Sequence, residues 1–343
     1  MVRRPLALLV GVALLAVAAA PVAARNENAV NAFDVTVLQT DASDASLVNG
    51  WGIVSGPATP WWVSNEGTDT STLYNAAGVK QALTVGVAGG PTGVVFNGGT
   101  AFPVTPGGTN AARFIFATLS GTVKAWTGGL TDAVTRAGTD GVYTGLTIAT
   151  SGGAPYLYAA DFASGRVDVY DGAFALQDWD GAFVDPALPA GYAPFGIQEI
   201  GGTIFVASAL AGPNGEEQTG DGLGVVSAFG TDGSFQGRVG TGDALNAPWG
   251  LAIAPATWGR FAGHLLVGNF GDGRINTFRP TPAGWEPSGH LKTVDHQPLV
   301  IDGLWGISFG KGAANNGPTS SLFFAAGPEE ETGGAFGVIT ATP

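Results

Sequence analysis

A short motif recurs six times along the chain and constrains its fold more than any other feature. In each copy an aromatic residue or a threonine precedes a glycine, and a run of β-branched and apolar residues follows. The six glycines are Gly52, Gly93, Gly145, Gly196, Gly250 and Gly306, spaced by 41, 52, 51, 54 and 56 residues. Repetition at this period indicates that each copy forms one structural unit of a solenoid or a propeller.

Each copy continues with further stretches of strand-like sequence. An apolar run such as 114–117 or 322–325 follows the glycine motif, and a third stretch follows a tight turn with glycine, as in 165–170. A fourth strand gives the weakest signal, and 81–85 is its best example. Six units of about four strands predict an all-β fold, a six-bladed β-propeller with four strands per blade.

The two ends of the repeat region complement each other. The sixth unit has three predicted strands and stops near Thr340, while a strand-like segment at 33–38 precedes the first unit. We therefore expect 33–38 to form the outer strand of the last blade and to close the ring, because closure removes open sheet edges. A pair of β-sandwiches is the competing fold, but it does not account for six similar starts. The 56 glycines and 21 prolines disfavour helical bundles.

The N-terminus has the pattern of a targeting segment. Arg3 and Arg4 precede an apolar run over 6–20, and small residues follow at 22–24. The run is shorter than the roughly 20 residues that cross a bilayer, so it predicts a secretory signal peptide over 1–24, cut after Ala24. The propeller would then occupy 25–343 as a single domain with no membrane span. We expect a secreted or periplasmic bacterial protein, exported by the Sec or the twin-arginine route.

Composition and charge narrow the classes of partner. The formal net charge is −13, and 1–24 contains two basic residues and no acidic one. An acidic surface repels nucleic acid and anionic lipid, so neither is expected as a main partner. The chain has no cysteine and three histidines, which argues against thiol chemistry and a multi-histidine metal centre. We expect a monomer that binds an unknown ligand or an extracytoplasmic protein.

A ring of equivalent positions is the candidate metal site. In a propeller, the innermost strands begin at the face to which the loops between second and third strands return. Alignment of the second strands on their last small residue gives the ring Asn65, Thr118, Asp161, Ser208, Asn269 and Gly327. The oxygens of Asn65, Asp161 and Asn269 suit a hard cation such as Ca²⁺. Alternatively, these side chains cap their own tight loops, as Asn and Asp commonly do.

The same face carries a candidate ligand surface. Glu66 and Asp272 lie in the loops of the ring, and Trp51, Trp249 and Trp305 stand at the motif starts. Indole rings at a channel mouth would stack on a ligand such as a sugar ring. The alternative is that these large aromatic side chains fill the core between blades.

The repeats resemble an uncharacterised family of secreted bacterial NHL-like propeller proteins, some of which carry a PEP-CTERM anchor. The resemblance covers about 33–340, and its most specific segments are 70–74, 159–162, 246–251, 267–276, 301–306 and 322–328. It implies an NHL-like propeller and no particular activity. The chain has no PEP-CTERM sequence, so we expect no retention by such an anchor.

Two functions are compatible with these features. The first is a binding module that acts through the loop face, and the second is a calcium-dependent hydrolase of the lactonase or esterase kind. In the second, a channel cation would act as a Lewis acid with Asp161 or Asp272 as base. The ring offers one carboxylate, which is few for tight calcium binding, and no catalytic motif stands in its required context. We therefore favour the binding module and leave open whether the protein is an enzyme.

Overall fold

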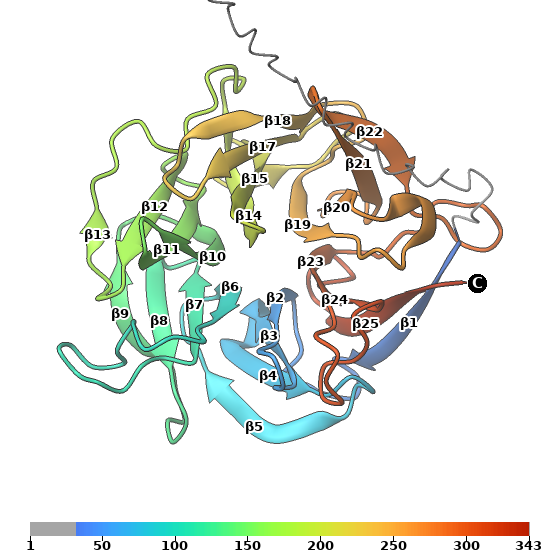
Figure 1. Ribbon diagram of the computed structural model, residues 1–343. Helices are drawn as coiled ribbons and strands as arrows, with labels where there is room; N and C mark the ends of the chain where they lie inside the picture. The colour runs from blue at the N-terminus through green and yellow to red at the C-terminus, as the bar shows by residue number, and fades with distance from the viewer. Residues whose placement is uncertain (1–31, 343) are drawn as a thin grey trace, which may run out of the picture.

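Six antiparallel sheets surround a central axis (Figure 1). The computed structural model describes residues 32–342, so the predicted signal peptide and its cleavage site lie outside the described residues. Within this range there is no α-helix, only the short 3₁₀ helices η1 (Glu66–Thr68) and η2 (Gly259–Phe261). No helix in 32–342 is long and apolar enough to cross a membrane. The predicted all-β six-bladed propeller is confirmed.

The chain builds the blades one after another, and each blade runs from its innermost strand outward (Figure 1). Blade 1 contains β2 (Gly50–Val54), β3 (Trp61–Asn65), β4 (Thr70–Tyr74) and β5 (Lys80–Gly86). Blade 2 contains β6 (Pro91–Phe96), β7 (Phe114–Thr118), β8 (Thr122–Trp126) and β9 (Val134–Gly138). Blade 3 contains β10 (Tyr143–Ser151), β11 (Ala154–Asp161), β12 (Arg166–Asp171) and β13 (Leu176–Gln177). Blade 4 contains β14 (Tyr192–Ile200), β15 (Thr203–Ala211), β17 (Val225–Gly230) and β18 (Phe235–Thr241). Blade 5 contains β19 (Pro248–Ile253), β20 (Leu265–Asn269), β21 (Ile275–Thr281) and β22 (Gly284–His290). Blade 6 contains β23 (Leu304–Phe309), β24 (Leu322–Ala326), β25 (Ala335–Ala341) and β1 (Phe33–Thr40). The two-residue strand β16 (Glu217–Gln218) pairs with β15 in blade 4.

The N-terminal strand closes the ring as predicted. β1 pairs antiparallel with β25, with Val35 opposite Ile339, and becomes the outer strand of blade 6 (Figure 1). A blade built from both ends of the described chain ties the first and last repeats together. The exposed edge that a three-stranded blade would leave is therefore covered.

The motif glycines lie where neighbouring innermost strands approach each other. A Cβ atom added to any of them would meet a backbone atom of the next blade's innermost strand, at 2.2 Å for Gly196, 2.3 Å for Gly52 and Gly93, 2.5 Å for Gly250, 2.7 Å for Gly306 and 3.0 Å for Gly145. The last of these contacts runs from Gly306 back to Trp51, so the six contacts form a closed wheel. At these six positions the neighbouring strands approach too closely to leave room for a Cβ atom, which explains why the motif requires glycine.

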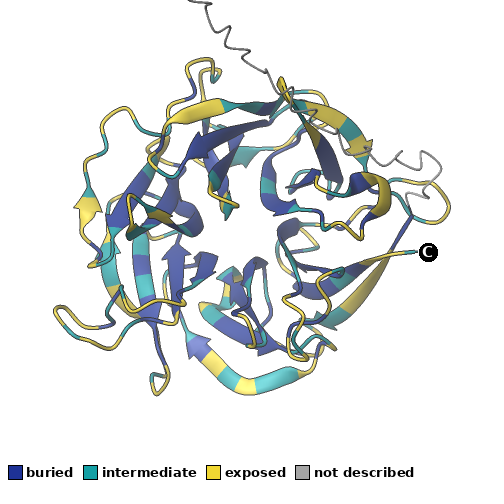
Figure 2. Ribbon diagram, viewed as in Figure 1, coloured by how far each residue is buried: buried dark blue, intermediate teal, exposed yellow. Residues whose placement is uncertain are grey.

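Burial falls from the axis to the rim (Figure 2). Most residues of the two inner strands of each blade are buried, while outer strands such as β5, β9 and β22 alternate between intermediate and exposed residues. Hydrophobic clusters fill the wedges between blades; Trp62, Phe114 and Trp126, for example, pack where blades 1 and 2 meet. Large aromatic side chains outside the glycine motif therefore fill this wedge.

Candidate functional site

The ring positions proposed from the sequence are structurally equivalent. Asn65, Asp161 and Asn269 pair with Gly50, Tyr143 and Pro248, each two residues before a motif glycine. Thr118 and Ser208 occupy the same register opposite Pro91 and Pro194. The alignment of the second strands was therefore correct at these five positions. In blade 6 it is one residue off, because Ala326 rather than Gly327 pairs with Leu304, two residues before Gly306.

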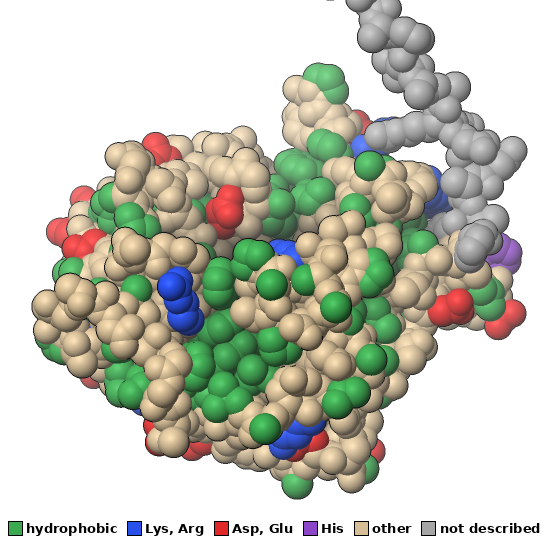
Figure 3. All heavy atoms as spheres, turned by 60° about the horizontal axis from the view of Figure 1, so that its bottom comes forward, with side chains coloured by type: hydrophobic (Ala, Val, Ile, Leu, Met, Phe, Trp, Pro, Cys, Tyr) green, Lys and Arg blue, Asp and Glu red, His purple; other side chains and the backbone are tan. Residues whose placement is uncertain are grey.

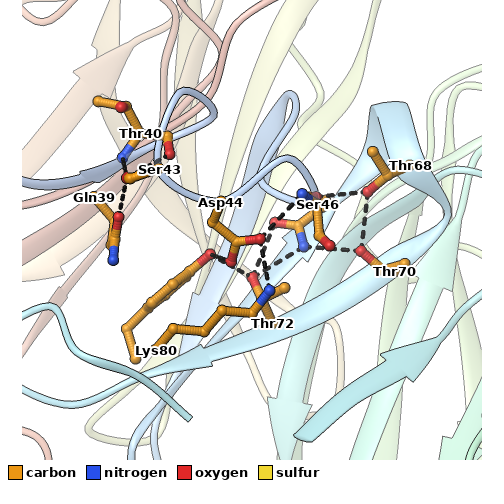
Figure 4. Close-up of polar contacts among 11 residues, drawn as sticks. Gln39, Thr40, Ser43, Asp44, Ser46, Thr68, Thr70, Thr72 and Lys80 are labelled. Carbon is orange, nitrogen blue, oxygen red and sulfur yellow. Dashed lines mark hydrogen bonds and ion pairs between the residues drawn. The ribbon is translucent and has the colours of Figure 1, made fainter. Parts of the chain in front are cut away.

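Asn65 belongs to a hydrogen-bonded network inside blade 1 (Figure 4). Its amide donates to the hydroxyls of Thr70 and Thr72, both at 3.0 Å. The network continues from Thr72 through Tyr74 to the buried carboxylate of Asp44, which also pairs with Lys80 at 2.6 Å. These bonds hold the amide of Asn65 within its own blade, through hydroxyl groups of the adjacent strand β4 rather than through a cap of its own loop.

The other two ring side chains also serve nearby loops. One carboxylate oxygen of Asp161 accepts from the backbone N–H groups of Val142 and Ser164, both at 3.1 Å. The amide of Asn269 donates to the carbonyl of Ala244 at 2.7 Å and to Asp272 at 3.0 Å.

Two oxygens of these side chains are left over. Oδ2 of Asp161 and Oδ1 of Asn269 are buried without a hydrogen bond, although an Arg166 nitrogen lies 3.8 Å from the former. Within 32–342, no three His, Cys, Asp or Glu residues form a group that could hold a metal ion. Calcium binding stays a prediction.

The three motif tryptophans close the axis, and together with Phe195 and Phe270 they form what we term the aromatic plug. Trp305 is fully buried; it packs edge-on against Trp51 at 4.1 Å and stacks on Phe270 at 4.0 Å. Trp249 lies face to face with Trp51 at 6.5 Å. Beside Trp249 the axis narrows to a space of about 20 Å³, room for about one water molecule.

Hydrogen bonding separates these tryptophans into two kinds. The indole N–H of Trp305 donates to the Asn49 side chain, and that of Trp249 donates to the Thr144 carbonyl, both at 2.9 Å. The indole N–H of Trp51 is buried without a partner. The indole N–H groups of Trp249 and Trp305 thus have partners, whereas that of Trp51 is an unused donor.

A pocket of about 340 Å³ opens above the plug, and we term it the acidic pocket. All six blades contribute to it, through Trp51, Leu119, Val142, Thr144, Phe162, Gly215, Glu216, Glu217, Thr219, Phe270 and Glu331. Its floor is apolar and aromatic, and its three ionisable residues are all glutamates. Of the ligand face expected from the sequence, Trp51 lines this pocket; Trp249, Trp305, Glu66 and Asp272 do not.

Burial and repulsion between carboxylates raise the pKa values of two of these glutamates, Glu217 and Glu331. Burial, reinforced by the charges of Glu331 and Glu216, raises the pKa of Glu217 to about 7. Burial also raises the pKa of Glu331, and the charges of Glu66 and Glu216 add to that rise. The amide of Asn49 donates to Glu331 at 2.6 Å and to Glu66 at 3.2 Å. The pocket therefore concentrates negative charge with one amide to relieve it.

Glu216 and Glu217 were not identified from the sequence. They lie on the loop between β15 and β17, the longest loop between second and third strands of any blade. That length, together with two adjacent glutamates, was an available signal. What the sequence did not show is that the loop folds back over the axis.

Comparison with solved structures supports the fold. The virginiamycin B lyase of Staphylococcus aureus has a TM-score of 0.53 and 13% identity, over 90% of this chain and all of that chain. The soluble aldose sugar dehydrogenase of Escherichia coli has a TM-score of 0.51 and 12% identity, over 90% and 100%. At such low identity the likeness concerns the propeller alone.

Sequence relatives are viral rather than the bacterial proteins that the resemblance led us to expect. No protein-family profile matches the chain. Uncharacterized protein L690 of Acanthamoeba polyphaga mimivirus is 33% identical over 320 residues, covering 86% of this chain and 81% of its own. Uncharacterized protein R648 of the same virus is 32% identical, covering 88% and 77%. The chain therefore belongs to the family of uncharacterized proteins that includes L690 and R648.

Proposed function

We propose that the protein is an exported binding protein whose acidic pocket takes a small organic cation with an apolar body. The observation that carries this proposal is the composition of the pocket: an aromatic floor beneath three glutamates, with no basic residue among its lining. Trp51, Phe162 and Phe270 supply the aromatic part of that floor.

The energetics favour a cation over other ligands. Burial raises the pKa values of Glu217 and Glu331, so ionising these carboxyl groups is less favourable in the pocket than in water. A bound ammonium group would offset that cost with charge-assisted hydrogen bonds. Aromatic faces such as those of Trp51 and Phe270 also attract cations. A ligand without charge would satisfy only the floor.

The test compares two probes of the same shape. Phenethylamine and 2-phenylethanol share an aromatic body and differ in the charged group. In calorimetry at fixed ionic strength, we expect the amine to bind more tightly than the alcohol. We also expect Glu217→Gln to weaken amine binding about tenfold, the size of one lost charged hydrogen bond.

Glu330→Gln is the matched control for this test. It removes the same charge from an exposed neighbour of Glu331 that does not line the pocket, so amine binding should be unchanged. Equal weakening in both variants would mean that the net charge of the protein attracts the amine. In that case the pocket would have no specific role.

A calcium-dependent hydrolase is the second candidate, favoured by the two buried oxygens of Asp161 and Asn269 that lack hydrogen bonds. A cation bound only by the folded protein would raise the melting temperature. Calcium should then stabilise the wild-type protein but not Asp161→Ala, while Glu330→Ala should respond like wild type. If neither calcium nor a chelator moves the melting temperature, the hydrolase proposal fails.

A further inference from the structure

A second pocket occupies the opposite end of the axis, where the innermost strands finish. Its volume is about 570 Å³, and five of the six blades line it. Apolar side chains such as Ile53, Val94 and Phe96 make up about half of the walls, and polar groups make up the rest. We term this space the basal pocket. Figure 3 shows that hydrophobic side chains also gather on the molecular surface, with single Lys or Arg side chains near them.

The loops around the basal pocket are held in place by one buried side chain. The amide of Asn316, which is fully buried, donates to the carbonyls of Gly56, Pro57 and Thr59 at 3.1–3.2 Å. Its side-chain oxygen accepts the backbone N–H of Lys311 at 3.1 Å. The loop after β23 is thereby fixed against the loop after β2, and Lys311 and Ser55 are brought to the same pocket.

Lys311 is a cation without a counter-ion. It takes part in none of the ion pairs formed within 32–342. The one carboxylate among the lining residues is that of Glu199, which accepts the backbone N–H of Gly202 at 2.7 Å in its own turn. Nearby protein atoms lower the pKa of Lys311 by burial, although the residue is exposed on its outer side. Among the lysines without an ion pair within 32–342, Lys311 is the one that lines this pocket.

Ser55 supplies the second polar feature. It is 3% exposed, and its hydroxyl oxygen is buried without a hydrogen bond. Buried hydroxyl groups ordinarily have a partner, so one that lacks it in a pocket wall is suited to a ligand. The basal pocket thus offers one cation and one free hydroxyl beside a large apolar surface.

We propose that the basal pocket binds an apolar molecule that carries a carboxylate, with Lys311 as its counter-ion and Ser55 as a hydrogen-bond donor. The walls around Ile53, Val94 and Phe96 hold the apolar body. This site is separate from the acidic pocket in both place and charge preference, and it stands whether or not the acidic pocket binds a cation.

The experiment uses octanoate and 1-octanol as probes of equal chain length. Calorimetry on the purified protein should show octanoate binding at least about tenfold more tightly than octanol, because only the carboxylate pairs with the amine. Lys311→Met keeps the length of the side chain and should abolish that preference. Lys124→Met removes a lysine that does not line the pocket, and it should preserve the preference.

A second measurement reports on the lysine directly. The chain has four lysines, so ¹³C-dimethylated lysine signals are few enough to assign with the Lys311→Met variant. Saturating octanoate should raise the midpoint of the Lys311 titration and leave the Lys124 midpoint in place. Equal binding of octanol and octanoate, unchanged octanoate binding in Lys311→Met, or no binding by either probe would each overturn the proposal.

Discussion

Replacing one motif glycine by alanine tests the glycine wheel directly. The added methyl of Gly196→Ala would lie 2.2 Å from the carbonyl oxygen of Trp249, whereas ordinary contacts begin at 3.4 Å. The next two atoms in reach, at 2.8 Å, are also backbone atoms of Trp249, so no side chain can rotate away. The two innermost strands must therefore separate by about an ångström. Each of them is also fixed to its other neighbour in the closed ring.

The expected cost lies at the upper end of that for overpacked cores. Such substitutions cost about 1–3 kcal/mol, and more where the surroundings cannot relax. We expect about 3 kcal/mol for Gly196→Ala, which corresponds to a fall of roughly 5 °C in melting temperature for a domain of this size. Gly145→Ala, with its nearest backbone atom at 3.0 Å, should cost about 1 kcal/mol.

Gly128 provides the control. It has no heavy atom within 4 Å of an added Cβ, and its φ lies outside the left-handed region. Gly128→Ala should therefore be neutral or slightly stabilising, through the lower entropy of the unfolded chain. Thermal and urea unfolding followed by tryptophan fluorescence would rank the three variants. A Gly145→Ala variant as damaged as Gly196→Ala, or a Gly128→Ala variant as damaged as either, would refute the wheel.

Three further predictions concern closure and pH. Deleting 33–40 should expose the edge of β25 and produce aggregates in size-exclusion chromatography; a stable monomer would show that β1 is dispensable. Burial raises the pKa of Asp44, but hydrogen bonds from Lys80 and Tyr74 outweigh it and leave the value lowered. The stability from Asp44 is present above about pH 4 and lost as pH falls below it, so Asp44→Asn should flatten the acid limb of a stability–pH curve. The raised pKa of Glu217 has the opposite effect on folding stability: the stability that Glu217 contributes is fully present below about pH 4 and is lost as pH rises through 7. Glu217→Gln should remove this decline near pH 7 without altering the acid limb of the stability–pH curve.

The repeat pattern predicted the blades because it depends on local sequence. Each motif glycine marks an innermost strand, and the apolar run after it fixes the register of the second strand, so equivalent ring positions could be aligned. The incomplete sixth unit correctly predicted the pairing of β1 with β25. What the motif did not reveal is that its glycines face the neighbouring backbone, because that contact joins residues about 50 positions apart.

The chemistry of the site was harder to predict for a physical reason. The direction of an Asp or Asn side chain depends on the loop that supplies its partner, and Ala244 meets Asn269 from 25 positions away. Glu216 and Glu217 lie in the long segment between β15 and β17, whose path no hydrophobic period describes. Lys311 gave no signal either, because its place in the wall of the basal pocket depends on loop contacts between residues far apart in the sequence.

The aromatic plug divides the space along the axis into two wells, the acidic pocket and the basal pocket, each open at one end only. A strand of polymer cannot thread the molecule, so an occupant of either well must enter and leave by the same opening. Occupants of the two wells would never touch, and one could displace the other only by moving Trp249 and its neighbours. Because the wheel fixes these residues from every side, we expect the wells to fill independently, so that the affinity of each for its own probe is unaffected by saturation of the other.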